Sequence, residues 1–489
     1  MKPSHQNLLI ALVLFLMVAP IWVVDVPPLV DLPNHAARIN VLLNYDQNEF
    51  FQRHFEVLYE PIPNMGMDLI LVPLARLVGI WTAFKIFLSV VAVLFFVGCQ
   101  IIASAVHGRY PTVTSLIAPF FLYGGTFFYG YLNYVLSVAV FLVTFGLWLR
   151  WRESMFKRGY LVLLVLVACV YLSHLSSFAF LALAIIFYNL FQTFAKGVGE
   201  RSFKKWLADA SLFVLPSIAF LLFIRGSGTM GKMEWEGAWK KIIVSFGPFL
   251  SYDPAIDLIC YSVVFAGVVF LLFRGGSAIS RPLLFVAVTF FILFLPAPTN
   301  LFTAGDADSR IILPAFCLLF LAFDTKQPVR NHFVFALVFV ALLGIRQSVV
   351  AFRWHGMSKD LLNVAEMYKN LPPNSMTYVT YGDGYLSATP KTERIRFLSI
   401  GLANIDRGVI WPRLFAIRGQ QPLVFRAAQP YAELSMNNLG EWDQILSEYD
   451  HVWAFRVSDD VRNQLAMRGT IIAESGDILI LRKTSGNRK

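Results

Sequence analysis

Eleven apolar runs fill most of the first 350 residues, and they constrain the fold more than any other feature of the chain. The runs lie at about 8–24, 84–106, 113–128, 132–149, 160–173, 176–194, 207–224, 258–273, 282–297, 311–323 and 332–350. Several are shorter than the roughly 20 residues that a perpendicular membrane helix needs, so their ends must extend into aromatic or polar flanks. We therefore expect a polytopic α-helical membrane protein with about 11–12 transmembrane helices.

The overall composition supports this fold class. Hydrophobic residues make up 57% of the chain and charged residues 15%, whereas soluble domains have roughly 45–50% and 25%. An aqueous core could not bury so much apolar surface, which excludes a soluble enzyme, a disordered regulator and a disulfide scaffold. The net charge of +10 belongs mainly to the membrane half, so it does not indicate a nucleic-acid partner.

Basic loops between the runs predict the orientation of the helices. Every second loop is basic, and the positive-inside rule places these loops in the cytoplasm. Their basic residues are Arg150, Arg152, Lys157 and Arg158, then Lys196, Arg201, Lys204 and Lys205, then Arg274 and Arg281, and finally Lys326 and Arg330. Eleven crossings then put the N-terminus inside and the segments 25–66, 129–131, 173–176, 225–257 and 298–310 outside.

Two apolar segments, 67–80 and 8–24, do not fit the simple pattern of membrane crossings. A crossing at 67–80 would break the alternation of basic loops, so we expect an interfacial or partly inserted helix there. The run at 8–24 has only Lys2 ahead of it and no small-residue cleavage site, so we expect an uncleaved first helix rather than a signal peptide.

The charge density changes near residue 355. Residues 355–489 carry 30 charged residues in 135 positions, against 42 in the preceding 354. This contrast predicts a membrane domain over 1–354 and a soluble extracytoplasmic α/β domain over 355–489. Helical spacing at 359–370 is followed by short β-type runs at MTYVT, LVFRA, HVWAFRV, TIIAE and ILILR, with a tight turn at SGD.

Polar residues gather in the first outer loop, 25–66. Asp25 follows the first helix, and Asp31, His35 and Arg38 are spaced i, i+4 and i+7, so they share one face of a short helix. A carboxylate at the membrane boundary can act as a general base or bind a divalent metal, and an Arg can bind a phosphate. In the structural alternative, Asp31 only caps the helix. Apolar residues on a neighbouring face predict an amphipathic helix on the membrane surface.

Three further outer segments carry candidate binding residues. TAGDADSR supplies Asp306, Asp308 and Arg310, and a lipid phosphate would explain an arginine entering the outer leaflet, although snorkelling to headgroups would as well. His174 lies between two short helices, where it either binds substrate or packs in a loop. Tyr131 and Asn133 are weak candidates for sugar binding. The Trp- and Lys-rich loop 225–257 fits an interfacial flap.

Some mechanisms lack support in the sequence. No P-loop, GxSxG, HExxH or GxGxxG motif stands in a suitable context. Acidic residues deep within the apolar runs are nearly absent, which weighs against an ion-coupled transporter.

The order of these features resembles the GT-C superfamily, which consists of integral-membrane glycosyltransferases that use polyprenyl-phosphate-linked sugars. The local sequences DLPNHAAR, GYLNYVLSVAVFLVTFGLWLR, YLSHLSSFAFLALAI and DADSRIILPAFCLL also resemble uncharacterised bacterial GT-C-like membrane proteins. The resemblance covers the whole chain in outline. GT-C enzymes commonly carry adjacent or near-adjacent acids in the first outer loop, whereas five residues separate Asp25 from Asp31 here.

The resemblance implies an inverting sugar transfer from a polyprenyl-phosphate-linked donor to an envelope glycan, lipid or protein acceptor, on the outer face of a bacterial inner membrane. Asp31 or Asp25 would be the general base, with Asp31 the possible ligand of a divalent metal (Mg²⁺ or Mn²⁺). Arg38 and Arg310 would contact the donor phosphate, supported by His35 or His174.

Two alternatives remain open on the sequence. The chain could be an envelope polysaccharide polymerase or ligase, which would share the lipid donor and the outer-face site. It could also be a non-catalytic membrane transporter or assembly protein, because the scarcity of buried charges argues against ion coupling but not against a scaffold.

Overall fold

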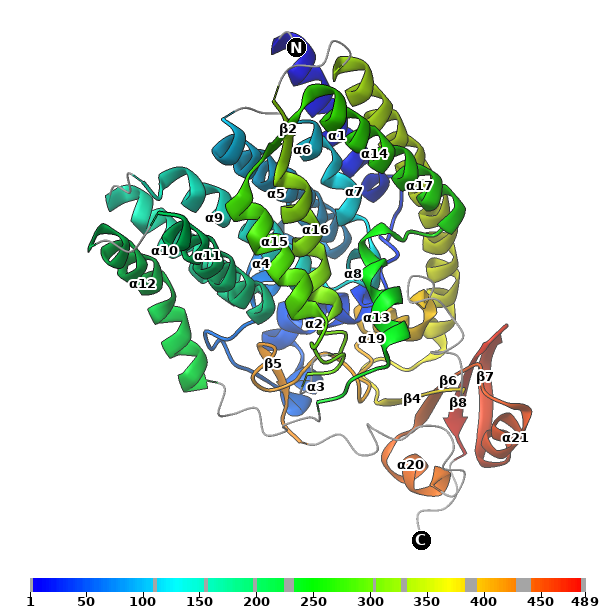
Figure 1. The fold of residues 1–489 in the computed structure, drawn as a ribbon. Coiled ribbons are helices and arrows are strands. Elements are labelled where there is room, and N and C mark those ends of the chain that lie inside the picture. Colours follow the sequence, from blue (N-terminus) through cyan, green and yellow to red (C-terminus); the bar gives the residue numbers. More distant parts are fainter. Residues whose placement is uncertain are drawn as a thin grey trace. The chain divides into compact units, whose positions relative to one another are not determined.

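The computed structural model describes residues 3–108, 112–153, 157–196, 200–223, 233–301, 305–326, 332–382, 394–427 and 441–484. Arg330 and the first part of the 225–257 loop lie outside these ranges. The chain divides into two compact units (Figure 1). The first contains Met1–Val24, Glu60–Ile70 and Phe84–Arg353, and the second contains Asp25–Tyr59, Leu71–Ala83 and Trp354–Lys489. The acid-bearing loop therefore groups with the C-terminal region, whereas the sequence assigned it to the membrane domain.

Helices build the first unit. Within the described residues, six helices are long and apolar enough to cross a membrane, and the segments Gln6–Trp22, Arg281–Phe294 and Ser309–Leu321 are shorter apolar helices. The helices that lie wholly or mainly in this unit are α1 (Pro3–Trp22), α5 (Ile80–His107), α6 (Val113–Ile117), α7 (Pro119–Leu122), α8 (Gly125–Tyr129), α9 (Leu132–Trp151), α10 (Lys157–Ser173), α11 (Leu175–Lys196), α12 (Glu200–Phe223), α13 (Ala238–Ser245), α14 (Pro254–Gly275), α15 (Arg281–Phe294), α16 (Ser309–Leu321) and α17 (His332–Met367). Strands β2 (Ser277–Ile279) and β3 (Phe323–Thr325) form a short antiparallel pair.

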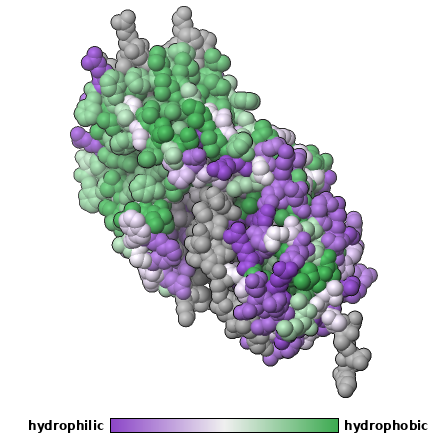
Figure 2. Space-filling view, turned by 90° about the vertical axis from the view of Figure 1, so that its right-hand side faces the viewer, coloured by the Kyte–Doolittle hydropathy of each residue, from purple (hydrophilic) through white to green (hydrophobic). Residues whose placement is uncertain are grey.

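The surface of these helices is apolar. Figure 2 shows hydrophobic residues gathered over the visible face of the helical unit and hydrophilic residues over much of the sheet-bearing unit. Large exposed apolar side chains on the membrane-length helices α12 and α14 include Leu207, Leu215, Leu222, Leu258, Phe265 and Phe273. Contiguous exposed apolar surface of this kind would be unstable in water and suits contact with lipid.

One expected membrane helix is broken. The run 113–128 forms three short helices, α6 to α8, instead of one. Pro119 lacks an N–H and starts α7, while Gly124 packs so closely on the Pro248 backbone that a Cβ would lie 2.7 Å from its Cα. Gly130 ends α8 with φ at +88°. The apolar run did not reveal these interruptions, because the breaking residues are themselves apolar or small.

Two other helices differ in length from expectation. The expected segment 67–80 largely coincides with α4 (Gly66–Val78), whose 13 residues span about 20 Å, less than the roughly 30 Å hydrocarbon core. The helices expected at 332–350 and 359–370 form one 36-residue helix, α17. No proline interrupts residues 351–358, so nothing there ends the helix.

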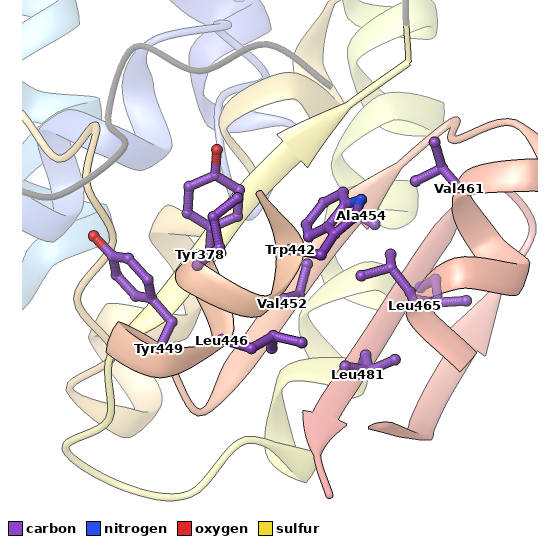
Figure 3. Close-up of a cluster of buried hydrophobic side chains, with 11 residues drawn as sticks. Tyr378, Trp442, Leu446, Tyr449, Val452, Ala454, Val461, Leu465 and Leu481 are labelled. Atoms are coloured by element: carbon purple, nitrogen blue, oxygen red, sulfur yellow. The ribbon is translucent and has the colours of Figure 1, made fainter. Parts of the chain in front are cut away.

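The second unit contains a mixed four-stranded sheet of order β4-β6-β8-β7. Its strands are β4 (Thr377–Tyr381), β6 (His451–Phe455), β7 (Gly469–Ser475) and β8 (Ile478–Lys483); β4 and β6 are parallel, and the other pairs are antiparallel. Helices α20 (Trp442–Glu448) and α21 (Asp459–Arg468) contribute to the apolar core on one face, where Tyr378, Val452 and Leu481 meet Leu446 and Leu465 (Figure 3). The α/β character expected for the tail is present in this unit.

A second pairing joins distant parts of the sequence within this unit. Strand β5 (Leu423–Phe425), expected as a β-type run of the tail, pairs antiparallel with β1 (Phe55–Val57) from the first loop. The remaining helices are α2 (Leu32–Asn44), α3 (Glu49–His54) and α19 (Gly401–Arg407). Since a three-residue strand carries no information about its partner, the sequence could not predict this pairing.

His451 makes the second unit sensitive to acid. Its side chain is 4% exposed, and neither ring nitrogen has a hydrogen-bond partner among the described residues. Burial lowers the pKa of His451 below its usual value, while Asp450 raises it and Arg482 lowers it. The unfolded chain therefore binds a proton on this histidine at a higher pH than the folded unit does. Above the unfolded pKa of about 6.5 the histidine does not destabilise the fold, and as the pH falls below that value the free energy of unfolding decreases.

We expect faster amide hydrogen exchange in β6 and β8 when the pH falls from about 7.5 to about 5.5, after correction for the intrinsic pH dependence of exchange. His451→Gln should flatten this dependence in the full chain, because it removes the titrating group. His355→Gln serves as the matched control, since His355 is exposed on α17. Equal pH dependence in the wild type and His451→Gln would contradict the prediction.

Candidate functional site

Arg310 is the central cation of the first unit's candidate site. The Asp308 carboxylate caps α16 by accepting the Ser309 backbone N–H at 2.8 Å, which places Arg310 in the first turn of the helix. Arg310 is only 9% exposed, and its Nη2 donates to the Gly305 carbonyl at 3.2 Å. Its buried Nε has no hydrogen-bond partner among the described residues. A buried guanidinium with an unused donor favours an anionic ligand.

Tyr131 and Asp306 lie next to Arg310 in this site and contact each other. The Arg310 guanidinium lies 5.2 Å from the centre of the Tyr131 ring, in cation–π geometry. The Tyr131 hydroxyl donates to the Asp306 carboxylate at 2.6 Å. Asp306 has φ at +53°, in the left-handed region, so the loop holds it in a disfavoured conformation. The structure thus brings three of the sequence-predicted residues together.

His174 belongs to the same cluster through Tyr134. It lies between α10 and α11, and its ring packs edge-on against Tyr134 with the ring centres 5.6 Å apart. The Tyr134 hydroxyl in turn donates to the Arg310 carbonyl at 2.6 Å. Burial and the Arg310 charge lower the pKa of His174 well below its usual value, so the ring is neutral at pH 7. Because Nδ1 accepts the Ser176 N–H at 3.1 Å, the proton of the neutral ring lies on Nε2.

Asp308 and Asn133 are engaged by other protein groups. Asp308 accepts a 2.6 Å ion-pair contact from Lys241 in addition to capping α16. Asn133 accepts the Met67 N–H and donates to the Asn64 carbonyl, both at 2.8 Å. These contacts hold the start of α16 and the start of α4, so neither residue is proposed as a substrate contact.

The residues of the first outer loop lie in the second unit, at and before α2. Asp31 occupies the N-cap position of α2, but its side chain makes no capping hydrogen bond. The structural alternative of a capping Asp31 is therefore wrong. Asp31 is 8% exposed, and both His35 and Arg38 are buried, whereas Asp25 is exposed. The His35 ring packs edge-on against Phe415, with ring centres 5.0 Å apart.

Two asparagines fix α2 to the C-terminal segment of the same unit. Asn34 donates to the Arg413 carbonyl at 2.8 Å and accepts the Phe415 N–H at 2.9 Å, in the manner of a strand partner. Asn40 donates to the backbone and side-chain oxygens of Asn404 on α19, at 3.0 and 3.1 Å. Residues Leu32–Leu42 are all buried. This burial differs from the amphipathic membrane-surface helix that the sequence suggested.

Sequence reasoning missed Arg346, Asp257 and Lys241. Arg346 lies within α17 and is fully buried, and its Nε pairs with the Asp257 carboxylate at 2.9 Å. A single arginine inside an apolar run was an available signal, because a charge at that depth needs a partner. Lys241 was noted only as part of a Trp- and Lys-rich loop, since its acidic partner is 67 residues away.

Within the described ranges, no group of three or more His, Cys, Asp or Glu side chains is arranged to hold a metal ion. A divalent ion commonly takes several such ligands. Metal binding by Asp31 therefore stays a prediction from the resemblance, and no step proposed below depends on it.

Comparisons with known proteins identify the fold. No family model and no curated protein matches the chain. The crystal structure of ArnT from Cupriavidus metallidurans bound to undecaprenyl phosphate matches with a TM-score of 0.61 and 10% identity over 99% of both chains. ArnT from the same organism in the apo state matches with a TM-score of 0.59 and 11% identity over 97% of both chains. At this level of identity the likeness shows the fold alone, and it confirms the expected class: this chain is a multi-pass membrane protein with a GT-C-like fold.

Proposed function

We propose that the chain is a GT-C-type glycosyltransferase. It moves a sugar from a polyprenyl-phosphate-linked donor to an envelope glycan, lipid or protein acceptor on the outer face of a bacterial inner membrane. The observation that carries the proposal is Arg310, buried at the start of α16, whose Nε finds no partner in the described part of the chain and whose charge acts on the neutral His174. The fold likeness to a protein solved with undecaprenyl phosphate supports a lipid phosphate as the ligand.

The proposed reaction assigns one role to each polar group. Asp31 accepts the proton of the acceptor hydroxyl as its oxygen forms a bond to the anomeric carbon of the sugar, with inversion. The bond from that carbon to the phosphate oxygen breaks, and the leaving phosphate takes the electron pair. Arg310 stabilises the negative charge that develops there, and His174 donates a hydrogen bond through Nε2–H. Arg38 and His35 are proposed as further donor contacts, and Asp25 as the less suitable base because it is exposed.

Arg310→Gln tests the proposal. Gln keeps a polar side chain but removes the charge, so we expect sugar transfer to fall by roughly 10²–10³-fold, mainly in kcat. The measurement is a profile of lipid-linked sugars in a deletion strain complemented with each variant, followed by a transfer assay with the donor that accumulates. Arg274→Gln is the control, because Arg274 is exposed in the same unit. Equal donor profiles in wild type and Arg310→Gln would overturn the proposed role.

A further inference from the structure

Helix α13 has an amphipathic pattern that is oriented outward. Trp239, Ile242, Ile243 and Phe246 follow the spacing i, i+3, i+4 and i+7, so they share one face, which we call the apolar stripe. All four side chains are about half exposed or more, with Trp239 at 72%. A helix that packs on its own protein would bury such a stripe. Here the apolar stripe is exposed, and the side chain that packs against the protein is Lys241.

Lys241 anchors the opposite face of α13. Its ammonium group contacts the Asp308 carboxylate at 2.6 Å, donates to the Ala297 carbonyl at 2.5 Å and lies 5.0 Å from the Phe294 ring centre. The Asp308 side chain is 1% exposed, so the ion pair is largely shielded from water. Lys240, the preceding residue, has a 58% exposed side chain. The two neighbouring lysines therefore have different environments.

The surroundings of the apolar stripe indicate a lipid partner. Apolar side chains are also exposed around the end of α15, which contacts Lys241, at Ile292 and Leu295. Because α15 is an apolar helix and Lys241 of α13 lies against its Phe294, the stripe borders further apolar surface that suits lipid. Trp235, which donates to the Pro296 carbonyl at 2.9 Å, is 60% exposed beside it. Exposed Trp and Lys at such a position are typical of the headgroup layer.

We propose that α13 is a membrane-surface helix that inserts its apolar stripe into the bilayer and transmits this contact to α16 through the Lys241–Asp308 ion pair. Asp308 caps α16, and Arg310 follows two residues later. Lipid contact thereby fixes the first turn that carries Arg310. The lipid contact of α13 and its coupling to α16 through Lys241 and Asp308 do not depend on the proposed function. The consequence for phosphate binding rests on the proposed function.

Spin labels on α13 test the lipid contact in the full chain. The exposed Cys169 is first replaced by Ala, and single labels are placed at 243, on the apolar stripe, or at 240. In lipid nanodiscs we expect the label at 243 to be reached by oxygen and shielded from a water-soluble nickel complex, with the reverse at 240. Equal nickel access at both sites would overturn the proposal. So would shielding of 243 from both reagents, which would indicate a protein partner or a second copy.

The coupling is tested by Lys241→Gln with Lys240→Gln as the matched control. Loss of a charged hydrogen bond should speed amide exchange in the first turn of α16 by more than about tenfold, while Lys240→Gln leaves it unchanged. Unchanged exchange in Lys241→Gln would remove the link to α16. Because neither readout measures sugar transfer, failure here and failure of the proposed function are distinguishable.

Discussion

Asp31→Asn is expected to reduce sugar transfer by roughly 10²–10⁴-fold, the range for loss of a general base. Asn has nearly the same shape as Asp but cannot accept the proton of the acceptor hydroxyl. Asp31 suits this role because its carboxylate is buried at the start of α2, whereas Asp25 is exposed. A strain carrying Asp31→Asn should accumulate the same lipid-linked donor as the deletion strain, as judged by lipid-linked sugar profiling.

Asp25→Asn is the matched control for this prediction. Asp25 is exposed, so its neutralisation should leave most of the transfer activity. Membrane insertion and monodispersity of both variants show that a loss is not caused by misfolding. If Asp25→Asn alone abolishes transfer, Asp25 is the base. If both variants keep full activity, neither acid acts as one, and the chemistry assigned to the first loop is wrong.

The sequence predicted the fold where one pattern determines one element. Long apolar runs such as 132–149 became single helices, because a membrane-length run has few alternatives. The turn at Gly476, with φ at +58°, likewise joins β7 to β8 as the SGD signal indicated. The sequence did not predict the structure where the pattern was short or was interrupted by small apolar residues. The run 113–128 hid the breaks at Pro119 and Gly124, and the short strand β5 pairs with β1 rather than with the sheet.

The candidate site was predictable in part for the same reason. Arg310 and His174 stood out because a polar residue near the end of an apolar run needs an explanation, and the structure places both around Tyr134. The sequence did not single out two buried acids near the ends of the apolar runs. Asp257 lies in the first turn of α14, and Asp209 in α12 accepts hydrogen bonds from Trp148 and Asn189, each at 2.7 Å. Such pairs depend on distant partners that spacing does not reveal.

The buried pair of Arg346 and Asp257 completes the fold of the broken helices. Helix α7 ends at Leu122, so carbonyl groups in and after it lack partners from a following turn. Arg346 donates to the Phe120 carbonyl at 3.3 Å and to the Tyr123 carbonyl at 2.6 Å. Asp257 also accepts the Ser251 hydroxyl at 2.8 Å. A helix break at membrane depth is tolerated only when such groups are satisfied, and Arg346 satisfies them here.

Arg346→Met is therefore expected to destabilise the protein by about 3–5 kcal/mol, because it leaves the Asp257 charge buried without its cation and removes the hydrogen bonds from Arg346 to the carbonyls near α7. Arg346→Met with Asp257→Asn should be more stable than Arg346→Met alone, since the second change removes the unpaired charge. Thermal unfolding of the full chain in one detergent measures both. Arg353→Met is the control, because Arg353 is exposed on the same helix, α17. If Arg346→Met unfolds like Arg353→Met, the pair does not stabilise the broken helices, and packing alone holds them.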